Sequence, residues 1–240
     1  MHALTLLLGD GRFPGGGHAH SGGLEAAVAN GTVADLDGLR DFLVGRLTTT
    51  GAVDAWAAAV ACSGEDAALV EAEYEARCPS PALRAAGRAQ GRGLKRAAAR
   101  SWPEVGECPA EQHAVVLGVA AHAAGLSPSD AASLALHAVL MGTAAAAVRL
   151  LPIDMADAAA AVASLAPIAD QIAPHTSPSL KNGPANGHER SDFTDLERFW
   201  GEACLGEGSL ALEGGPAWSA PALEVLAEEH ARWEVRLFAS

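Results

Sequence analysis

The segment 9–25 reads GDGRFPGGGHAHSGGLE and determines how the rest of the chain is interpreted. Seven of its seventeen residues are glycine, which tolerates positive φ angles and close backbone approach, and Pro14 fixes one φ angle among them. Apolar residues at helical spacing begin at Leu24 and stop before Gly31. We therefore predict a structured loop that leads into a short helix, with Ser21 as its N-cap and Gly31 just beyond its C-terminal end.

The same segment does not match the common nucleotide-binding motifs. Gly9 and Gly11 begin like a dinucleotide-binding fingerprint, but Pro14 occupies the place of its third glycine, and no strand–helix–strand unit surrounds it. The chain also contains no GxxxxGK[ST] phosphate-binding loop. These observations exclude a dinucleotide-binding fold and a P-loop nucleotide hydrolase.

His18 and His20 are the residues of this segment that could bind a metal ion. They form a lone HxH pair, and further ligands do not follow at a recognisable spacing. The alternative is that the two imidazoles form hydrogen bonds with backbone groups in a tight loop. We favour that alternative and predict no metal site and no cofactor.

The amino-acid composition favours a helical protein and argues against a nucleic-acid-binding protein or a disulfide-rich one. Half of the residues are hydrophobic but only 5% are aromatic, and alanine accounts for much of the difference. Alanine favours close helix–helix packing and is poor strand material. The net charge of −13 argues against a nucleic-acid-binding protein, whose affinity depends on basic contacts with phosphates. Four cysteines without a CxxC pair predict reduced thiols rather than a zinc site or disulfide framework.

Neither a membrane segment nor a signal peptide is predicted. The longest apolar region, around 134–151, is interrupted by His137 and Arg149, and its transfer energy is weak for a membrane span. The N-terminal apolar run has no Lys or Arg before it and ends at Asp10. We therefore expect a cytoplasmic protein with no membrane contact.

Helical periodicity runs through most of the chain and predicts an all-α, single-domain helical bundle over residues 1–240. Glycine, asparagine and proline dominate 174–190, which indicates a flexible linker or insertion over 174–218 before the C-terminal helix. The predicted helices span approximately 36–47, 53–62, 69–76, 81–100, 111–124, 128–150, 155–173, a short 191–204 and a last helix that begins at 221.

The helix over 81–100 carries a ridge of basic residues, from Arg84 to Arg100. Such a ridge could bind an acidic partner. The favoured alternative is a solvated face that the preceding acidic helix neutralises. His122 and His137 lie on apolar helices without acidic or thiol ligands at suitable spacing, so we expect hydrogen-bonded core histidines there.

The C-terminal segment is the second informative stretch. Leu223, Leu226, His230, Trp233 and Leu237 follow at intervals of three and four, which predicts an apolar seam on one helix. The chain then ends in RLFAS. A large apolar side chain two positions from the chain end is unfavourable in water, so Phe238 is expected to insert into a partner or to fold back.

Both ends of the chain resemble the UreF family of urease accessory proteins. The family's N-terminal motif is approximately PxGx[FY]xHSxGLE, and PGGGHAHSGGLE is similar to it, with His18 at the aromatic position. The family's C-terminal pattern ends in RLFxS, and SAPALEVLAEEHARWEVRLFAS resembles it. In addition, RLLP at 149–152 resembles an internal Arg-Leu-x-Pro of the family.

The resemblance implies more than the residues show by themselves. Proteins of this family are all-helical, form dimers, and bridge the accessory protein UreD (UreH in some systems) and the GTPase UreG in a complex that delivers nickel to apo-urease. The resemblance also implies a non-catalytic role and assigns partner binding by position. The positions concerned are His20, Ser21, Leu24, Glu25, Arg236, Leu237, Phe238 and Ser240.

Arg236 is the candidate for an effect on the GTPase, by analogy with an arginine that acts in trans on a bound nucleotide.

The sequence leaves two alternatives to the scaffold function open. One is a small helical metal-dependent hydrolase that uses His18, His20 and a distant carboxylate, and the other is a nickel carrier. Tightly held zinc would favour the hydrolase, and stoichiometric nickel binding by the isolated chain would favour the carrier.

Overall fold

A computed structural model of the chain describes residues 3–14, 20–175 and 220–238. Every regular element within these ranges is a helix, which confirms the predicted all-α class. In chain order the elements are α1 (Ala3–Gly9), α2 (Leu24–Ala29), α3 (Leu36–Arg46), the π-helical turn η2 (Leu47–Gly51), α4 (Ala52–Cys62), α5 (Ala67–Ala76), α6 (Pro81–Ala98), α7 (Pro103–Gly106), α8 (His113–Ala123), α9 (Pro128–Leu150), α10 (Met155–His175) and α12 (Pro221–Ala231).

Side-chain caps begin several of these helices. At the start of α9 the hydroxyl of Ser127 accepts a hydrogen bond from the backbone N–H of Asp130 (3.1 Å), and the Asp130 carboxylate accepts one from the N–H of Ser127 (3.1 Å). Asp35 caps α3, and Asp154 accepts from the N–H of Asp157 at the start of α10 (2.8 Å). Each cap satisfies an N–H group that has no partner within its helix.

One predicted helix break is wrong. The chain does not stop at Gly51 but passes from α3 through η2 directly into α4. The hydroxyls of Thr48 and Thr49 donate back to the carbonyls of Val44 and Gly45 (2.9 and 2.6 Å), and such back-bonding bends and widens a helix without ending it. The absence of a Cβ at Gly51 is needed for packing, because a Cβ there would lie 2.8 Å from the carbonyl oxygen of Arg46.

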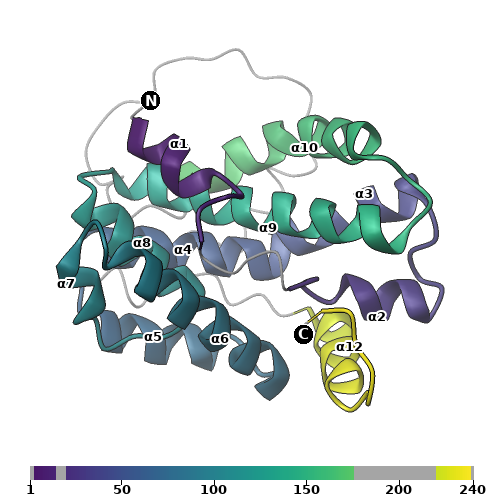
Figure 1. Cartoon of the computed structure of the whole chain (residues 1–240), viewed down its shortest axis with the longest axis horizontal. Helices are drawn as coiled ribbons and strands as arrows, with labels where there is room; N and C mark the ends of the chain where they lie inside the picture. The colour runs from purple at the N-terminus through teal and green to yellow at the C-terminus, as the bar shows by residue number, and fades with distance from the viewer. Residues whose placement is uncertain (1–2, 15–19, 176–219, 239–240) are drawn as a thin grey trace.

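Helix α4 is the centre of the bundle. Ten of its eleven residues are buried, and it packs against α9 on one side and α8 on the other (Figure 1). Alanine and glycine let these helices approach closely. A Cβ on Gly118 of α8 would lie 2.3 Å from the carbonyl oxygen of Ala58 in α4, so only glycine fits at that crossing.

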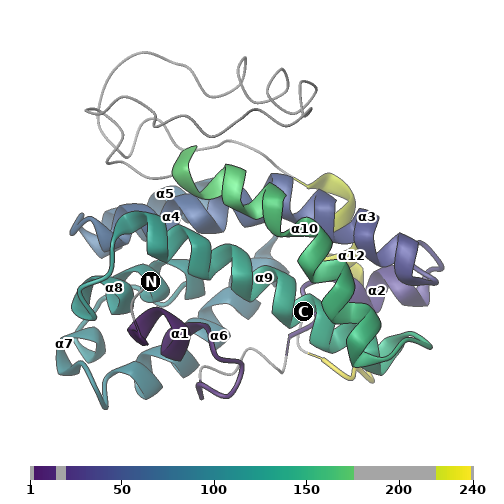
Figure 2. The ribbon, with the colours of Figure 1, turned by 90° about the horizontal axis from the view of Figure 1, so that it is seen from above.

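The remaining helices cover this centre. Helix α10 lies over α9 and α3 (Figure 2), and α1 lies against α9. Helix α12 packs against α2 and α6 at the far end of the molecule (Figure 1). By length and composition alone α9 could cross a membrane, but 61% of its apolar window is buried inside the fold, as is usual for the central helix of a bundle.

The structure gives several residues of the basic ridge on α6 a partner, but of these described residues only Arg88 forms an ion pair with the preceding acidic helix, as the favoured interpretation expected. Arg88 forms an ion pair with Glu75 of the preceding acidic helix α5 (2.6 Å), and Arg92 pairs with Glu111 (2.9 Å). Lys95 donates to the carbonyl of Cys108 (2.6 Å). Most of the ridge therefore contributes to packing between α6 and its neighbours.

The prediction of core histidines needs a correction. His122 forms a hydrogen bond with the carbonyl of Cys62 (2.8 Å), and His137 forms one with the carbonyl of Gly9 (3.0 Å). Both imidazoles are hydrogen-bonded as expected, but both residues are exposed. The physical reason is that each imidazole reaches sideways to a carbonyl at the C-terminal end of another helix, where no following turn supplies an N–H donor to that carbonyl.

The predicted insertion, 174–218, lies almost entirely outside the described residues, and so does the short helix predicted over 191–204. Its first boundary is corrected, because Pro174 lies within α10, which continues to His175.

Candidate functional site

A buried carboxylate near the N-terminus holds the C-terminal tail. Glu25, in the first turn of α2, is 8% exposed. One of its oxygens accepts from the backbone N–H of Leu237 (2.8 Å), and the other accepts from the N–H of Phe238 (3.0 Å) and lies 2.8 Å from Nε2 of His230. A buried carboxylate is tolerated only when such hydrogen bonds replace its lost hydration.

Phe238 is the second anchor of the tail. Its side chain is 4% exposed and belongs to the same hydrophobic cluster as Leu24. The guanidinium of Arg149 lies over the ring, 4.5 Å from its centroid, in a cation–π contact. Of the two alternatives for Phe238, folding back onto the chain is therefore the one that the structure confirms.

The residues just before the second anchor point outward. Val235 is 86% exposed and Leu237 is 64% exposed, and Arg236 between them is exposed as well. We call Val235–Leu237 the tail triplet. The backbone of Leu237, the last residue of the triplet, is anchored by Glu25, and the anchored Phe238 follows it. The chain therefore presents an apolar–basic–apolar surface at a defined place on the molecule.

The predicted apolar seam is correct for its first part only. Leu223 and His230 are buried, and His230 packs edge-on against Trp233 with ring centroids 4.8 Å apart. However, α12 ends at Ala231, and Leu237 is exposed rather than on the seam. The tail leaves the helix because it must turn back to reach Glu25, a contact that no local pattern signals.

The N-terminal residues of the predicted site are mostly internal. Ser21 and Leu24 are 1% and 0% exposed. Gly23, with φ +89°, is the N-cap of α2, whereas the Ser21 hydroxyl accepts from the N–H of Glu25 (3.4 Å). The predicted cap therefore lies two residues too early, while Gly31 follows the helix as expected, with φ +79°.

The structure brings Glu25 together with Leu237 and Phe238, and it places His20 elsewhere, on the wall of a cavity. Ser240 lies outside the described residues. Partner binding by the eight positions stays a prediction.

A contact between helices that the sequence did not indicate holds α12 in place. One oxygen of the Glu228 carboxylate accepts from the hydroxyl of Ser80 (2.5 Å) and from the backbone N–H of Ala82 (2.8 Å). These hydrogen bonds, with smaller effects from Arg232 and Arg84, lower the pKa of Glu228. Glu228 thus secures α12 to the N-terminal end of α6, separately from the tail.

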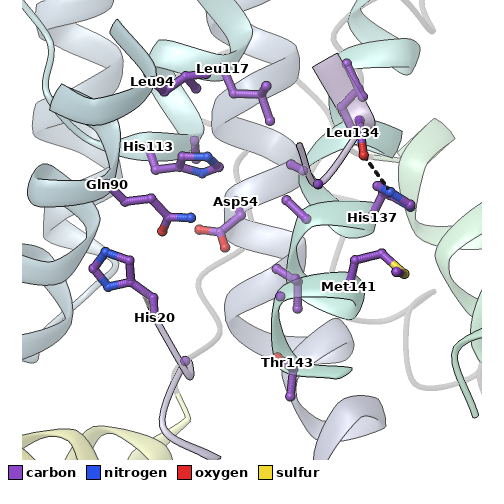
Figure 3. Close-up of a pocket in the computed structure, with 18 of the residues that line it drawn as sticks. His20, Asp54, Gln90, Leu94, His113, Leu117, Leu134, His137, Met141 and Thr143 are labelled. Carbon is purple, nitrogen blue, oxygen red and sulfur yellow. Dashed lines mark hydrogen bonds between the residues drawn. The ribbon is translucent and has the colours of Figure 1, made fainter. Parts of the chain in front are cut away.

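A cavity of about 360 Å³ lies between α1, α4, α6, α8 and α9. Four polar side chains from different elements lie close together at one end of it: His20, Asp54, Gln90 and His113 (Figure 3). Leucine side chains from α1, α6, α8 and α9 form much of the remaining wall. The cavity therefore combines a cluster of polar side chains with a largely apolar wall, in which His137 and Thr143 are further polar residues (Figure 3).

Burial shifts the pKa values of the ionisable groups around this cavity. It raises the pKa of Asp54 to about 6, although a hydrogen bond from the Tyr74 hydroxyl (2.8 Å) and the charge of Arg46 oppose the shift. Burial, together with the nearby His20, lowers the pKa of His113 to about 4. Asp54 and His113 are not among the residues predicted from the sequence, although a charged residue inside the apolar run AVDAWAAAVAC was a signal for Asp54.

Arg46 completes the polar lining. Its guanidinium donates to the hydroxyl of Thr143 (3.0 Å) and lies where a Cβ on Gly22 would be. Burial lowers its pKa, against the opposing charge of Asp54. Within residues 3–14, 20–175 and 220–238, no three His, Cys, Asp or Glu side chains gather as they would around a metal ion, and His18 lies outside those ranges.

Comparison with known proteins identifies the family. The UreF family model matches residues 33–166. The chain is 39% identical to the urease accessory protein UreF of Mycolicibacterium vanbaalenii, over 99% of this chain and 98% of that protein. It is 37% identical to the urease accessory protein UreF of Mycobacterium sp. strain JLS, over the full length of both. It is 45% identical to the Mycobacterium tuberculosis protein of the same name, over 52% of this chain and 62% of that one. The chain therefore belongs to the UreF family of urease accessory proteins.

Proposed function

We propose that this chain acts in urease maturation as a non-catalytic scaffold. In this proposal it bridges a UreD/UreH-type accessory protein and a UreG-type GTPase, so that nickel reaches apo-urease within the assembled complex. It works as a cytoplasmic homodimer. Membership of the UreF family and the names of the relatives support the maturation role, and the resemblance at both chain ends supports the choice of partners.

The observation that carries the proposal is the tail triplet. Val235 and Leu237 are largely exposed although the chain beside them is anchored. Apolar side chains held in water are unfavourable unless a partner covers them. Arginine is also one of the residue types that are enriched in interface hot spots. We therefore assign Arg236 and its two neighbours to a protein contact.

The test is urease activation in a host that lacks its own UreF, with this chain supplied together with its cognate urease, UreD and UreG. Arg236→Ala is compared with Arg100→Ala, which removes another exposed arginine just beyond α6. We expect Arg236→Ala to reduce urease activity at least 10-fold, the size of loss that a hot-spot arginine typically causes, and Arg100→Ala to leave it near the wild-type level.

GTP turnover by the GTPase is measured on the same variants, with and without the scaffold. If Arg236→Ala leaves urease activation, complex formation and GTP turnover all unchanged, the assignment of Arg236 is wrong. A loss of complex formation without any change in turnover within the remaining complex would assign Arg236 to assembly alone.

A further inference from the structure

We propose that Glu25 is a positioning residue, a latch that fixes the tail triplet in the orientation that a partner protein binds. In this view Glu25 does not contact the partner, because its carboxylate is used inside the chain. The binding half of the inference rests on the proposed function, whereas the ordering of the tail can be measured on the chain alone.

The geometry at Glu25 requires a carboxylate. Its two oxygens accept from two consecutive backbone N–H groups, those of Leu237 and Phe238. An ionised carboxylate accepts at both oxygens, whereas a glutamine amide accepts at one atom and donates at the other. Glutamine would therefore turn an N–H donor of its own toward an N–H donor of the tail, and one of the two hydrogen bonds to the tail would be lost.

The position of the tail triplet depends on this contact. Helix α12 ends at Ala231. None of the residues from 232 to 237 is helical, and all of them are exposed except Trp233, which is partly buried. The segment is thus held at one end by α12 and at the other by the hydrogen bonds to Glu25 and the buried ring of Phe238. Without the latch, the triplet would sample many conformations before a partner bound it.

A pre-ordered segment binds more tightly than a free one, because the entropy of ordering has been lost before association. Fixing the backbone of even one or two residues at the moment of binding weakens affinity by about 10- to 100-fold. We expect a defect of that size when the latch is broken. The partner surface that fits the triplet is an apolar groove with an acidic group placed for Arg236.

A matched control separates the latch from the general docking of α12. Glu228 also accepts a backbone N–H through its carboxylate and holds α12 against α6, but the groups that donate to it, on Ser80 and Ala82, are not in the tail. Glu25→Gln and Glu228→Gln are therefore the same chemical change at two carboxylates that secure the C-terminal region. Only the first touches the tail.

The experiment makes two measurements on the full-length chain. The first is the rate of hydrogen exchange in the peptide that contains Leu237 and Phe238. The second is the Kd for binding to a purified UreD/UreH-type protein. For Glu25→Gln we expect tail exchange at least 10-fold faster and a Kd about 10- to 100-fold weaker. For Glu228→Gln we expect tail exchange at the wild-type rate. At saturating partner concentration, Glu25→Gln should recover urease activation, whereas Arg236→Ala should not.

Each outcome decides the inference. Unchanged tail exchange in Glu25→Gln, or equal acceleration in both glutamine variants, would overturn the latch. A loosened tail with wild-type affinity would show that the latch orders the tail but does not position the triplet for binding, and the inference would fail. If the wild-type chain itself binds no such partner, the proposed function fails while the tail measurement still stands. If Glu25→Gln does not fold, Glu25→Asp keeps the charge but draws the carboxylate back from both amides, and the same results are expected.

Discussion

Asp54 and His113 lie on the same cavity, and burial shifts their pKa values in opposite directions. The pKa of Asp54 rises to about 6, above the ordinary value of about 4 for an aspartate, so the folded chain binds a proton that the unfolded chain releases. The pKa of His113 falls to about 4, below the ordinary value of about 6.5, so the unfolded chain binds the extra proton. As pH rises from 4 to 6, Asp54 therefore lowers the free energy of unfolding and His113 raises it.

This opposition predicts two complementary variants. Relative to wild type, Asp54→Asn should become more stable as pH rises from 4 to 6, by up to about 3 kcal/mol. His113→Gln should be more stable than wild type by a similar amount near pH 4, and the difference should vanish above about pH 6.5. Urea unfolding between pH 4 and 7.5 measures both differences. Two parallel stability–pH curves for wild type and Asp54→Asn would contradict the assignment.

Among the helices, close crossings rather than large side chains hold the centre together. Gly118 places the backbone of α8 against the backbone of α4, and a Cβ at that position would meet the carbonyl of Ala58 and the side chain of Ala61 (2.3 and 2.7 Å). Because the obstacle is mainly backbone, it cannot move aside without separating two central helices.

Gly118→Ala should therefore destabilise the fold by about 1–3 kcal/mol through overpacking, despite the better helix propensity of alanine. Gly142 in α9 is the matched control, because a Cβ there would meet nothing within 4 Å. Gly142→Ala should stabilise the fold by up to about 1 kcal/mol. Thermal and urea unfolding of both variants checks this. Equal effects of the two substitutions would show that the α4–α8 crossing can widen without cost.

Over the whole molecule, stability should decrease from the centre to the periphery. Helix α4 is buried almost all round and adjoins α5, α8, α9 and α10. Helix α1 lies against α9 and leaves Leu6 and Leu7 62% and 44% exposed. The amides of α4 should then exchange only when the chain unfolds globally, and those of α1 through local opening at least about 100-fold faster. Native-state hydrogen exchange measures this, and equal protection of α1 and α4 would contradict it.

The sequence by itself determined the helical class, several of the helix starts and the family resemblance. Capping residues such as Ser127 and Asp154, and apolar residues at intervals of three and four, act through neighbours within one or two turns. Local patterns of this kind can be recognised without knowing the fold. Local patterns wrongly predicted a helix break at Gly51, because the sequence of a widened helical turn and that of a helix break have similar composition.

Only the tertiary structure decided which contacts the candidate site residues make. Glu25 and Phe238 are more than 200 positions apart, and nothing local shows that one accepts the backbone N–H of the other or that the tail triplet between α12 and this anchor is left exposed. Likewise, Asp54 and His113 share a cavity only because α4 and α8 pack side by side. The physical reason is that burial and pairing depend on which elements the fold brings together, whereas capping and periodicity depend on covalent neighbours alone.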